Sequence, residues 1–399
     1  MLQYAIAILA GILSGIVTGL TPGIHINLVS LIVVSTAAFL LNYFSLISLA
    51  CFIIAMSVTH SFLDAIPGIY LGAPSAEQVL GVLPGHRYLL QGNGLMALKL
   101  TLIGSFGALV LSTLMFPAFL LLVKYGYPLI RDYIGYFLVV IVIFMILTDR
   151  KPIWALFVFL TSGSLGYVVL NFPRLENPLF PLLSGLFGIA TLALSLNRNE
   201  KIPDQKTSNL IQIDIWKGIK ALFSGQFSGF LTAVLPGVGA SMAAVISVQF
   251  TRNLGDHGFM VLLGSVNTVN FIMSMATFYV LDKARNGSII AVQKLLGGID
   301  IPLIIIFLAC ALIAGSISVY LALKIAVMFG VLVNKVNYTI LVMCVIILLL
   351  GLTLFLSKLL GLMIVIISTA VGVIPAIVKV KRTHAMGCLM LPVMLYFLL

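Results

Sequence analysis

Long apolar stretches separated by short polar segments follow one another along all 399 residues. An α-helix needs roughly 17–25 apolar residues to cross a bilayer. Membrane β-strands would instead show segments of about ten residues that alternate in polarity, and this sequence has none. The pattern predicts an all-α polytopic membrane protein. The expected spans are 46–70, 95–123, 133–148, 152–172 and 179–197, then 257–280, 301–330, 336–356, 359–378 and 384–399.

Composition agrees with this class. The chain is 61% hydrophobic and 8% charged, against about 25% charged residues in soluble domains. The net charge of +11 needs no nucleic-acid partner, because lysine and arginine gather on the cytoplasmic loops of membrane proteins. The four cysteines are scattered through apolar segments without paired spacing. They indicate neither a disulfide framework nor a metal site, and no bound metal is expected.

A sequence repeat divides the chain near its midpoint. "GILSGIVTGLTPG" (Gly11 to Gly23) aligns without gaps to "GQFSGFLTAVLPG" (Gly225 to Gly237), and six of the 13 positions are identical. Between the two halves lies a polar stretch with seven charged residues, from Arg198 to Lys217. The expected organisation is a first repeat over 1–197, a polar linker over 198–217 and a second repeat over 218–399.

The number of crossings predicts that the two repeats have inverted topology. Each half has one helix pair broken at Pro-Gly, which returns the chain to its starting side, and about five further spans. Each half therefore ends on the side opposite to its start. With both termini outside the cell, the central linker and the basic segments 149–151 and 379–382 fall inside, which matches the positive-inside rule. We expect a multi-pass protein of the plasma membrane.

The Pro-Gly breaks are the strongest candidates for a functional site. Inverted repeats with broken helices are typical of secondary transporters, whose substrates bind near the bilayer midplane. A helix that restarts after such a break has backbone N–H groups without partners, and these attract anions. The competing interpretation is a kinked helix with glycines for close packing. The predicted substrate residues at the breaks are Thr21, Pro22, Gly23, His25 and Asn27 in the first half, and Pro236, Gly237, Gly239 and Ser241 in the second.

Polar residues inside the following spans extend this hypothesis. Asp64 is the carboxylate of an apolar span in the first half, and intramembrane carboxylates are usually functional. Asp64 and His60 either couple transport to Na⁺ or H⁺ or pair with each other. Arg87 is expected to neutralise an anionic substrate or to anchor the chain at the interface. In the second half, Asn267 and Asn270 lie at helical spacing and either bind substrate or bond across helices.

The same residues resemble the large permease subunit of tripartite tricarboxylate transporters. The resemblance rests on the Ser-Gly-x2-Thr-Gly-x2-Pro-Gly opening, on its repeat, and on "QGNGLMAL" (Gln91 to Leu98). The resemblance implies a membrane permease that moves carboxylate anions with an ion gradient. The chain is shorter than expected for that subunit, so we interpret it as a compact, divergent branch that works alone or with a small membrane subunit.

A second family shares the paired Pro-Gly segments. Polyprenyl-phosphate translocases move a lipid phosphate across the bilayer, and helix N-termini would suit that headgroup equally well. This lipid carrier is the alternative function. An enzyme is not expected, because the chain has neither the His-Glu-x2-His pattern of metalloproteases nor the paired Asp-rich motifs that bind Mg²⁺ in polyprenyl transferases.

Overall fold

The computed structural model describes most of the chain, and its described part is helical with no strand. It covers residues 2–21, 26–72, 82–175, 177–196, 203–206, 214–234, 240–251, 254–334 and 338–399. Seven helices are long and apolar enough to cross a membrane. The prediction of an all-α polytopic membrane protein is therefore confirmed.

The helices of the first half follow the predicted spans closely. The long ones begin at recognisable positions: Ser45 caps α4 by accepting a hydrogen bond from the N–H of Ser48, and Pro152 opens α11. The elements are α1 (Leu2–Leu20), α2 (Ile26–Ser35), α3 (Ala37–Leu40), α4 (Leu46–Leu63), α5 (Ala65–Tyr70), α6 (Val82–Leu90), α7 (Gly94–Leu114), α8 (Phe116–Leu121), η1 (Leu122–Gly126), α9 (Tyr127–Ile130), η2 (Arg131–Tyr133), α10 (Ile134–Leu147), α11 (Pro152–Leu170), α12 (Leu179–Leu183), η3 (Ser184–Ile189) and α13 (Ala190–Leu196).

The second half contains longer helices. Its elements are α14 (Ile215–Val234), α15 (Ala240–Phe250), α16 (Gly255–Leu281), α17 (Gly287–Leu296), α18 (Ile301–Asn334), α19 (Tyr338–Val378), η4 (Arg382–Met386) and α20 (Gly387–Leu398). Helix α19 is two helices joined at Lys358, whose φ of 55° and ψ of −159° are not helical. Gly361 packs against Thr353, which a straight helix would place about 12 Å further along its axis, so the chain folds back there.

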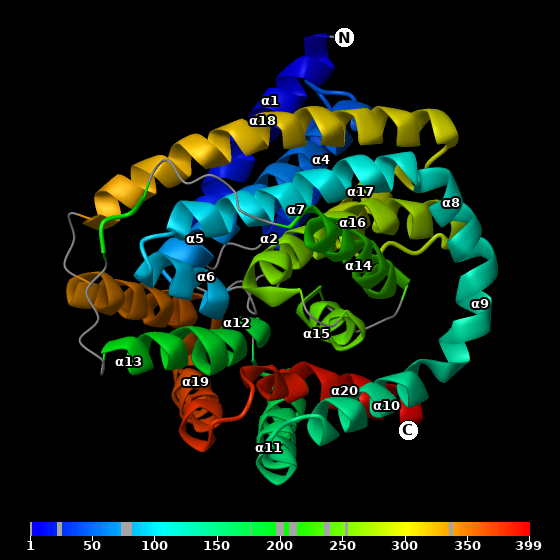
Figure 1. Cartoon of the computed structure of the whole chain (residues 1–399). Coiled ribbons are helices and arrows are strands. Elements are labelled where there is room, and N and C mark those ends of the chain that lie inside the picture. Colours follow the sequence, from blue (N-terminus) through cyan, green and yellow to red (C-terminus); the bar gives the residue numbers. More distant parts are fainter. Residues whose placement is uncertain are drawn as a thin grey trace.

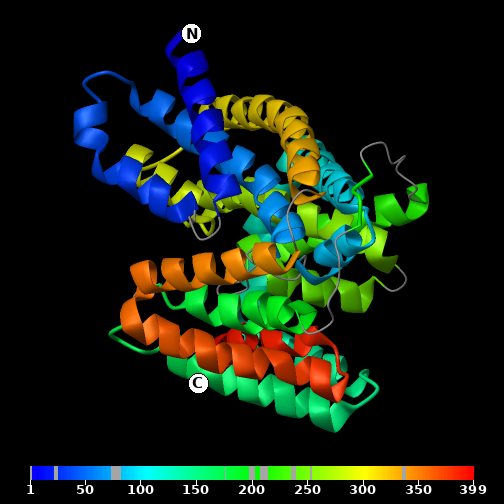
Figure 2. The ribbon, with the colours of Figure 1, turned by 90° about the vertical axis from the view of Figure 1, so that its left-hand side faces the viewer.

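These helices form two bodies that do not coincide with the two halves of the sequence (Figures 1 and 2). The first helical body comprises the described residues within 2–126 and 215–334, and the second comprises those within 134–196 and 338–398. Within the described residues, the bodies contact each other only slightly. Leu71 and Leu90 of the first body pack against the apolar cluster around Leu192 of the second.

In the first half of the chain, α1 and α4 run in the same direction. Gly11 packs against Phe52 and Ala55, and two turns later Gly19 packs against His60 and Leu63. The segment that contains α2 and α3 therefore returns the chain between them.

In the second half, α14 and α16 are also parallel. Gly225 packs against Ser265, and Gly229 packs against Val269. The intervening α15 is antiparallel to α14, because Ser224 bonds to Thr251 whereas Ser228 bonds to Ser247.

The two parallel pairs point in opposite directions. Helix α18 runs with α4, since Cys310 contacts Cys51 and Ser318 contacts Thr59. It runs against α7, because Tyr70 adjoins both Gly94 and Gly330 whereas Leu109 adjoins Gly315. Helix α7 in turn runs with α14, where Gly107 packs on Leu222 and Ser112 donates to Gln226. Thus α1, α4 and α18 share one direction and α7, α14 and α16 the other.

Candidate functional site

The structure describes eight of the residues predicted to form the site. Thr21 follows α1, Asn27 lies in α2, His60 and Asp64 lie at the end of α4, Arg87 lies in α6, Ser241 lies in α15, and Asn267 and Asn270 lie in α16. Pro22, Gly23, His25, Pro236, Gly237 and Gly239 fall outside the described residues, as do the side chains of Asn27 and Ser241. The predicted role of the two Pro-Gly breaks therefore stays a prediction.

The buried face of α16 separates structural polar residues from candidate ligands. Thr268 donates to the carbonyl of Gly264, and Ser274 accepts from the N–H groups of Arg285 and Asn286. Asn267 and Asn270 differ from these two, because buried amide atoms of both side chains have no hydrogen-bond partner among the described residues.

Asn267 is the more unusual of the pair. Its side chain is 5% exposed, and among the described side chains it alone keeps two buried atoms without a partner, Oδ1 and Nδ2. Asn270 adds a third such atom, Oδ1, one turn away on the same side of the helix. A buried polar group without a partner costs about 1–3 kcal/mol. A ligand that accepts from the amide N–H₂ and binds at the carbonyl oxygens would remove that cost.

The position of Asn270 relates this polar pair to the second break. Gly229 of α14 lies directly against the backbone of Asn270. The described part of α14 ends five residues later at Val234, a distance of about 7.5 Å along the helix. The two asparagines therefore lie within reach of the point where α14 stops.

The first half has a matching arrangement at the end of α1. His60 of α4 packs against Gly19, and its Nδ1 lies 3.1 Å from the hydroxyl of Thr18. Asp64 follows one turn later and is 5% exposed. Its backbone N–H bonds to the carbonyl of His60. A histidine and a carboxylate thus lie beside the end of α1, as the two amides lie beside α14.

Thr21 and Arg87 lie in less enclosed places. The Thr21 hydroxyl donates to the carbonyl of Val17, in the last turn of α1, at 2.7 Å. Arg87 forms an ion pair of 3.3 Å with Asp256 of α16, and both side chains are more than half exposed. Next to it, Tyr88 and His257 are joined by a 2.9 Å hydrogen bond. These two pairs connect α6 to the start of α16, so Arg87 lies outside the buried polar face.

The glycines of the Gln-Gly-x-Gly motif accommodate the linker. Gln205 is buried, accepts from the N–H of Gly94 at 3.1 Å and donates to the carbonyl of Leu89 at 2.9 Å. A Cβ on Gly92, whose φ is +73°, would lie 2.9 Å from the carbonyl oxygen of Asp204. The polar composition of the linker gave no sign of this docking.

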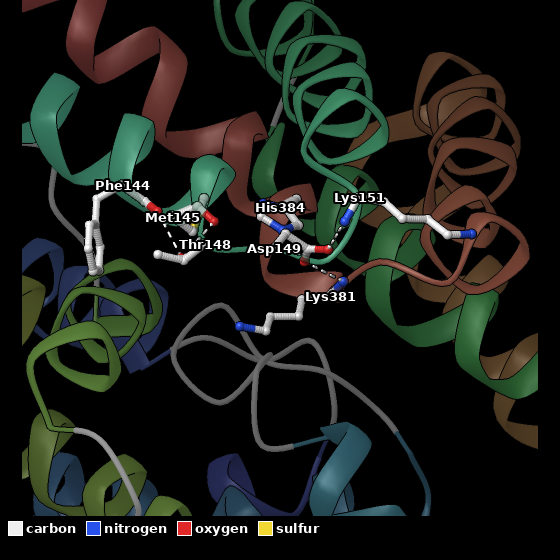
Figure 3. Close-up of polar contacts among 7 residues, drawn as sticks. All are labelled: Phe144, Met145, Thr148, Asp149, Lys151, Lys381 and His384. Atoms are coloured by element: carbon white, nitrogen blue, oxygen red, sulfur yellow. Dashed lines mark hydrogen bonds and ion pairs between the residues drawn. The ribbon is translucent and has the colours of Figure 1, made fainter.

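Sequence reasoning also missed a buried histidine–carboxylate pair that joins the two halves (Figure 3). His384 Nε2 lies 2.9 Å from Asp149 Oδ2, and both side chains are almost fully buried. Burial alone would raise the pKa of Asp149. Hydrogen bonds from His384 and from the N–H groups of Lys151 and Lys381 outweigh burial and lower this pKa. Burial lowers the pKa of His384, against the opposing effect of the carboxylate.

The fold defines a polytopic helical membrane protein, and its long apolar helices bury polar side chains between them. The chain matches the family described as the tripartite tricarboxylate transporter TctA family over residues 5–387. It therefore belongs to that family, and the resemblance inferred from the Pro-Gly and Gln-Gly-x-Gly segments is confirmed. Among the comparisons, nothing supports the polyprenyl-phosphate alternative. Because the family is one of transporters, the match agrees with a chain that is not an enzyme.

The family assignment extends over nearly the whole chain. A protein described as uncharacterized protein MJ1079, from Methanocaldococcus jannaschii, is similar at 27% identity over 389 residues, which is 94% of each chain. No solved structure matches the chain significantly.

Proposed function

We propose that this permease carries a carboxylate anion of the tricarboxylate class, bound beside the ends of α1 and α14. The observation that carries the proposal is the buried amide of Asn267, whose Oδ1 and Nδ2 both lack a partner among the described residues, with Asn270 Oδ1 one turn away. Each amide N–H₂ donates hydrogen bonds that a carboxylate accepts. The helix starts after Pro22-Gly23 and Pro236-Gly237 would add backbone N–H groups and the positive ends of two helix dipoles.

The opposite directions of the two helix sets support a pair of inverted repeats around this site. Helices α1 and α4 of the first half correspond to α14 and α16 of the second, and the two pairs are antiparallel to each other. In transporters of this architecture, half-helices from opposite sides meet at the substrate. The second helical body, with slight contact to the first, supports a cycle in which one body moves past the other.

Asp64 and His60 are the candidates for coupling. A buried carboxylate can take up a proton or bind Na⁺, and His60 can hold it in place or share the proton. Arg87 of α6 is exposed beside the start of α16, where it can attract an anion before the anion enters the permease. Binding of proton or sodium beside α1 would then offset the charge of the substrate.

Ligand binding tests the site directly. Citrate at a hundredfold excess over its dissociation constant should stabilise the purified wild-type protein against thermal unfolding by about 2.7 kcal/mol. Asn267→Leu, similar in volume and apolar, should fold and lose this stabilisation, while Thr268→Val in the next position should keep it. Equal citrate protection of all three proteins would show that Asn267 does not contact the substrate.

The family also supports a second protein subunit as a partner. A tripartite arrangement implies a small membrane subunit, and the helices of the second helical body expose many apolar side chains to the surroundings. Co-purification of a small, gene-adjacent membrane protein with the tagged chain would identify it. If the chain alone catalyses uptake at the full rate, no such subunit is needed.

A further inference from the structure

The Asp149–His384 pair gathers two basic loops that lie some 230 residues apart in sequence. One loop contains Arg150 and Lys151, and the other contains Lys379, Lys381 and Arg382. The N–H groups of Lys151 and Lys381 both bond to the Asp149 carboxylate, at 3.1 and 3.4 Å. We call these five cationic residues the basic platform.

The carboxylate inside the platform offsets only one of its five positive charges. Asp149 is buried, and its two oxygens are occupied by His384 and the two backbone N–H groups. His384 is neutral in this arrangement, because its Nδ1 is buried with no partner among the described residues. Protonation would bury a donor with no acceptor.

The five cations of the platform differ in whether their side chains have partners among the described residues. Lys151 Nζ donates to the carbonyl of Val378 at 3.0 Å, and Arg382 bonds to the hydroxyl of Thr191. The side chains of Arg150, Lys379 and Lys381 are exposed, and no ion pair involves them in the described part of the chain. Figure 3 shows the Lys151 and Lys381 side chains leading away from Asp149.

The platform lies where apolar helices end. Helix α10 ends just before it and α11 begins just after its first loop, and α19 ends at the second loop. Large apolar side chains next to the cations are exposed: Leu147 is 68% exposed, Ile153 82%, Trp154 46% and Ile377 69%. Exposed aliphatic residues with a tryptophan and basic residues at a helix end are typical of the boundary between lipid and water.

We propose that the basic platform binds the phosphate headgroup of an anionic membrane phospholipid. Arginine and lysine supply charge-assisted hydrogen bonds to phosphate oxygens, and the exposed isoleucines and Trp154 contact the acyl chains and glycerol region. A soluble anion would use the cations and leave this apolar rim without a role. The lipid stays bound at this end of the second helical body and is not transported.

The test uses phosphatidylglycerol titrated into the full-length protein in a zwitterionic detergent, with the thermal unfolding midpoint as the readout. The triple variant Arg150→Gln, Lys379→Gln, Lys381→Gln removes the three cationic side chains that have no ion-pair partner among the described residues, so its fold should be intact. A basic residue near an anionic lipid surface contributes about fivefold in affinity. Loss of three such contributions should therefore lower the apparent affinity for phosphatidylglycerol by about a hundredfold.

Matched variants distinguish the loss of the platform's cations from a general loss of positive charge. Lys283→Gln, Arg285→Gln, Lys294→Gln removes the same charge beside α17 and should bind phosphatidylglycerol like the wild type. The variant Arg150→Lys, Lys379→Arg, Lys381→Arg keeps the charge and should also retain binding.

Three results would overturn the proposal. The first is equal loss of affinity in the two glutamine variants, and the second is no loss in either. The third is full protection by inorganic phosphate with no additional effect of phosphatidylglycerol, which would assign the platform to a soluble anion.

Discussion

His384 Nε2 donates a hydrogen bond to Asp149 Oδ2 across 235 positions of sequence, and this pair fixes the loop between α10 and α11 to η4, just before α20. The bond requires the tautomer with hydrogen on Nε2. Ser162 of α11 also contacts the carbonyl of His384. The second helical body is thereby held together from both halves of the chain.

The pair predicts loss of stability in mild acid. The folded pKa of His384 lies below the ordinary value of 6.5, so the unfolded chain binds a proton below about pH 6.5 that the folded chain excludes. Stability is therefore full above that pH and falls as pH decreases toward the folded pKa. Asp149 adds a second loss of stability below about pH 3.8, since its folded pKa is also lowered.

The measurement is the unfolding midpoint as a function of pH. In His384→Gln this midpoint should be lower than in the wild type at neutral pH, and it should change less between pH 7 and 5.5. Identical slopes for the two proteins would contradict this account.

Gly104 of α7 and Gly264 of α16 allow two helix backbones to touch. A Cβ on Gly104 would lie 2.0 Å from the carbonyl oxygen of Val261, and one on Gly264 would lie 2.1 Å from that of Thr101. Gly104→Ala should force the helices apart and destabilise the protein by about 1–3 kcal/mol or more. Gly351→Ala, in a helix with open space around the glycine, is the control. Thermal unfolding should separate the two variants, and equal midpoints would refute the close crossing.

Much of the helix inventory follows from hydropathy alone. Spans predicted at 46–70 and 152–172 correspond to α4 with α5 and to α11, and the predicted gap between 356 and 359 is the reversal at Lys358. These elements are predictable because a run of apolar residues of membrane length has few other stable conformations. The short α6 and α17 were missed, because nine or ten residues of mixed polarity give a weak helical signal.

The candidate site was predictable in part. Asn267 and Asn270 stood out as amides in an apolar span, and the structure separates them from Thr268 and Ser274, whose backbone partners no sequence pattern reveals. The Asp149–His384 pair could not be predicted, because it depends on the packing of loops from different halves. The division into two helical bodies was hidden for the same reason.

Arg87 should matter for substrate affinity and little for stability. Its ion pair with Asp256 is exposed, and such pairs contribute about 0–1 kcal/mol. Arg87→Gln should unfold near the wild-type temperature and raise the KM for the anion with little change in kcat. The exchange Arg87→Asp with Asp256→Arg separates the two roles, because it restores the ion pair while moving the cation. A wild-type KM in the exchanged protein would mean that Arg87 serves only the pair.

Movement between the two helical bodies should be necessary for transport. Leu71 and Leu192 belong to different bodies and pack in one apolar cluster. With the native cysteines replaced, Leu71→Cys and Leu192→Cys joined by a short bifunctional thiol reagent should abolish uptake. The control pair Ser224→Cys and Thr251→Cys lies within the first body, where the native hydroxyls are 2.6 Å apart, and its cross-linking should leave uptake intact. Undiminished uptake after cross-linking of both pairs would exclude relative motion of the bodies.

The most direct test of the central claim is the flux of radiolabelled citrate into proteoliposomes under an imposed proton or sodium gradient. The account predicts gradient-dependent uptake by the wild type and by Thr268→Val, and loss of uptake by Asn267→Leu with the protein folded and inserted. Asn267→Leu should also unfold at a higher temperature than the wild type, since it removes two buried polar atoms without partners. Wild-type citrate uptake by folded Asn267→Leu would contradict a substrate site on α16.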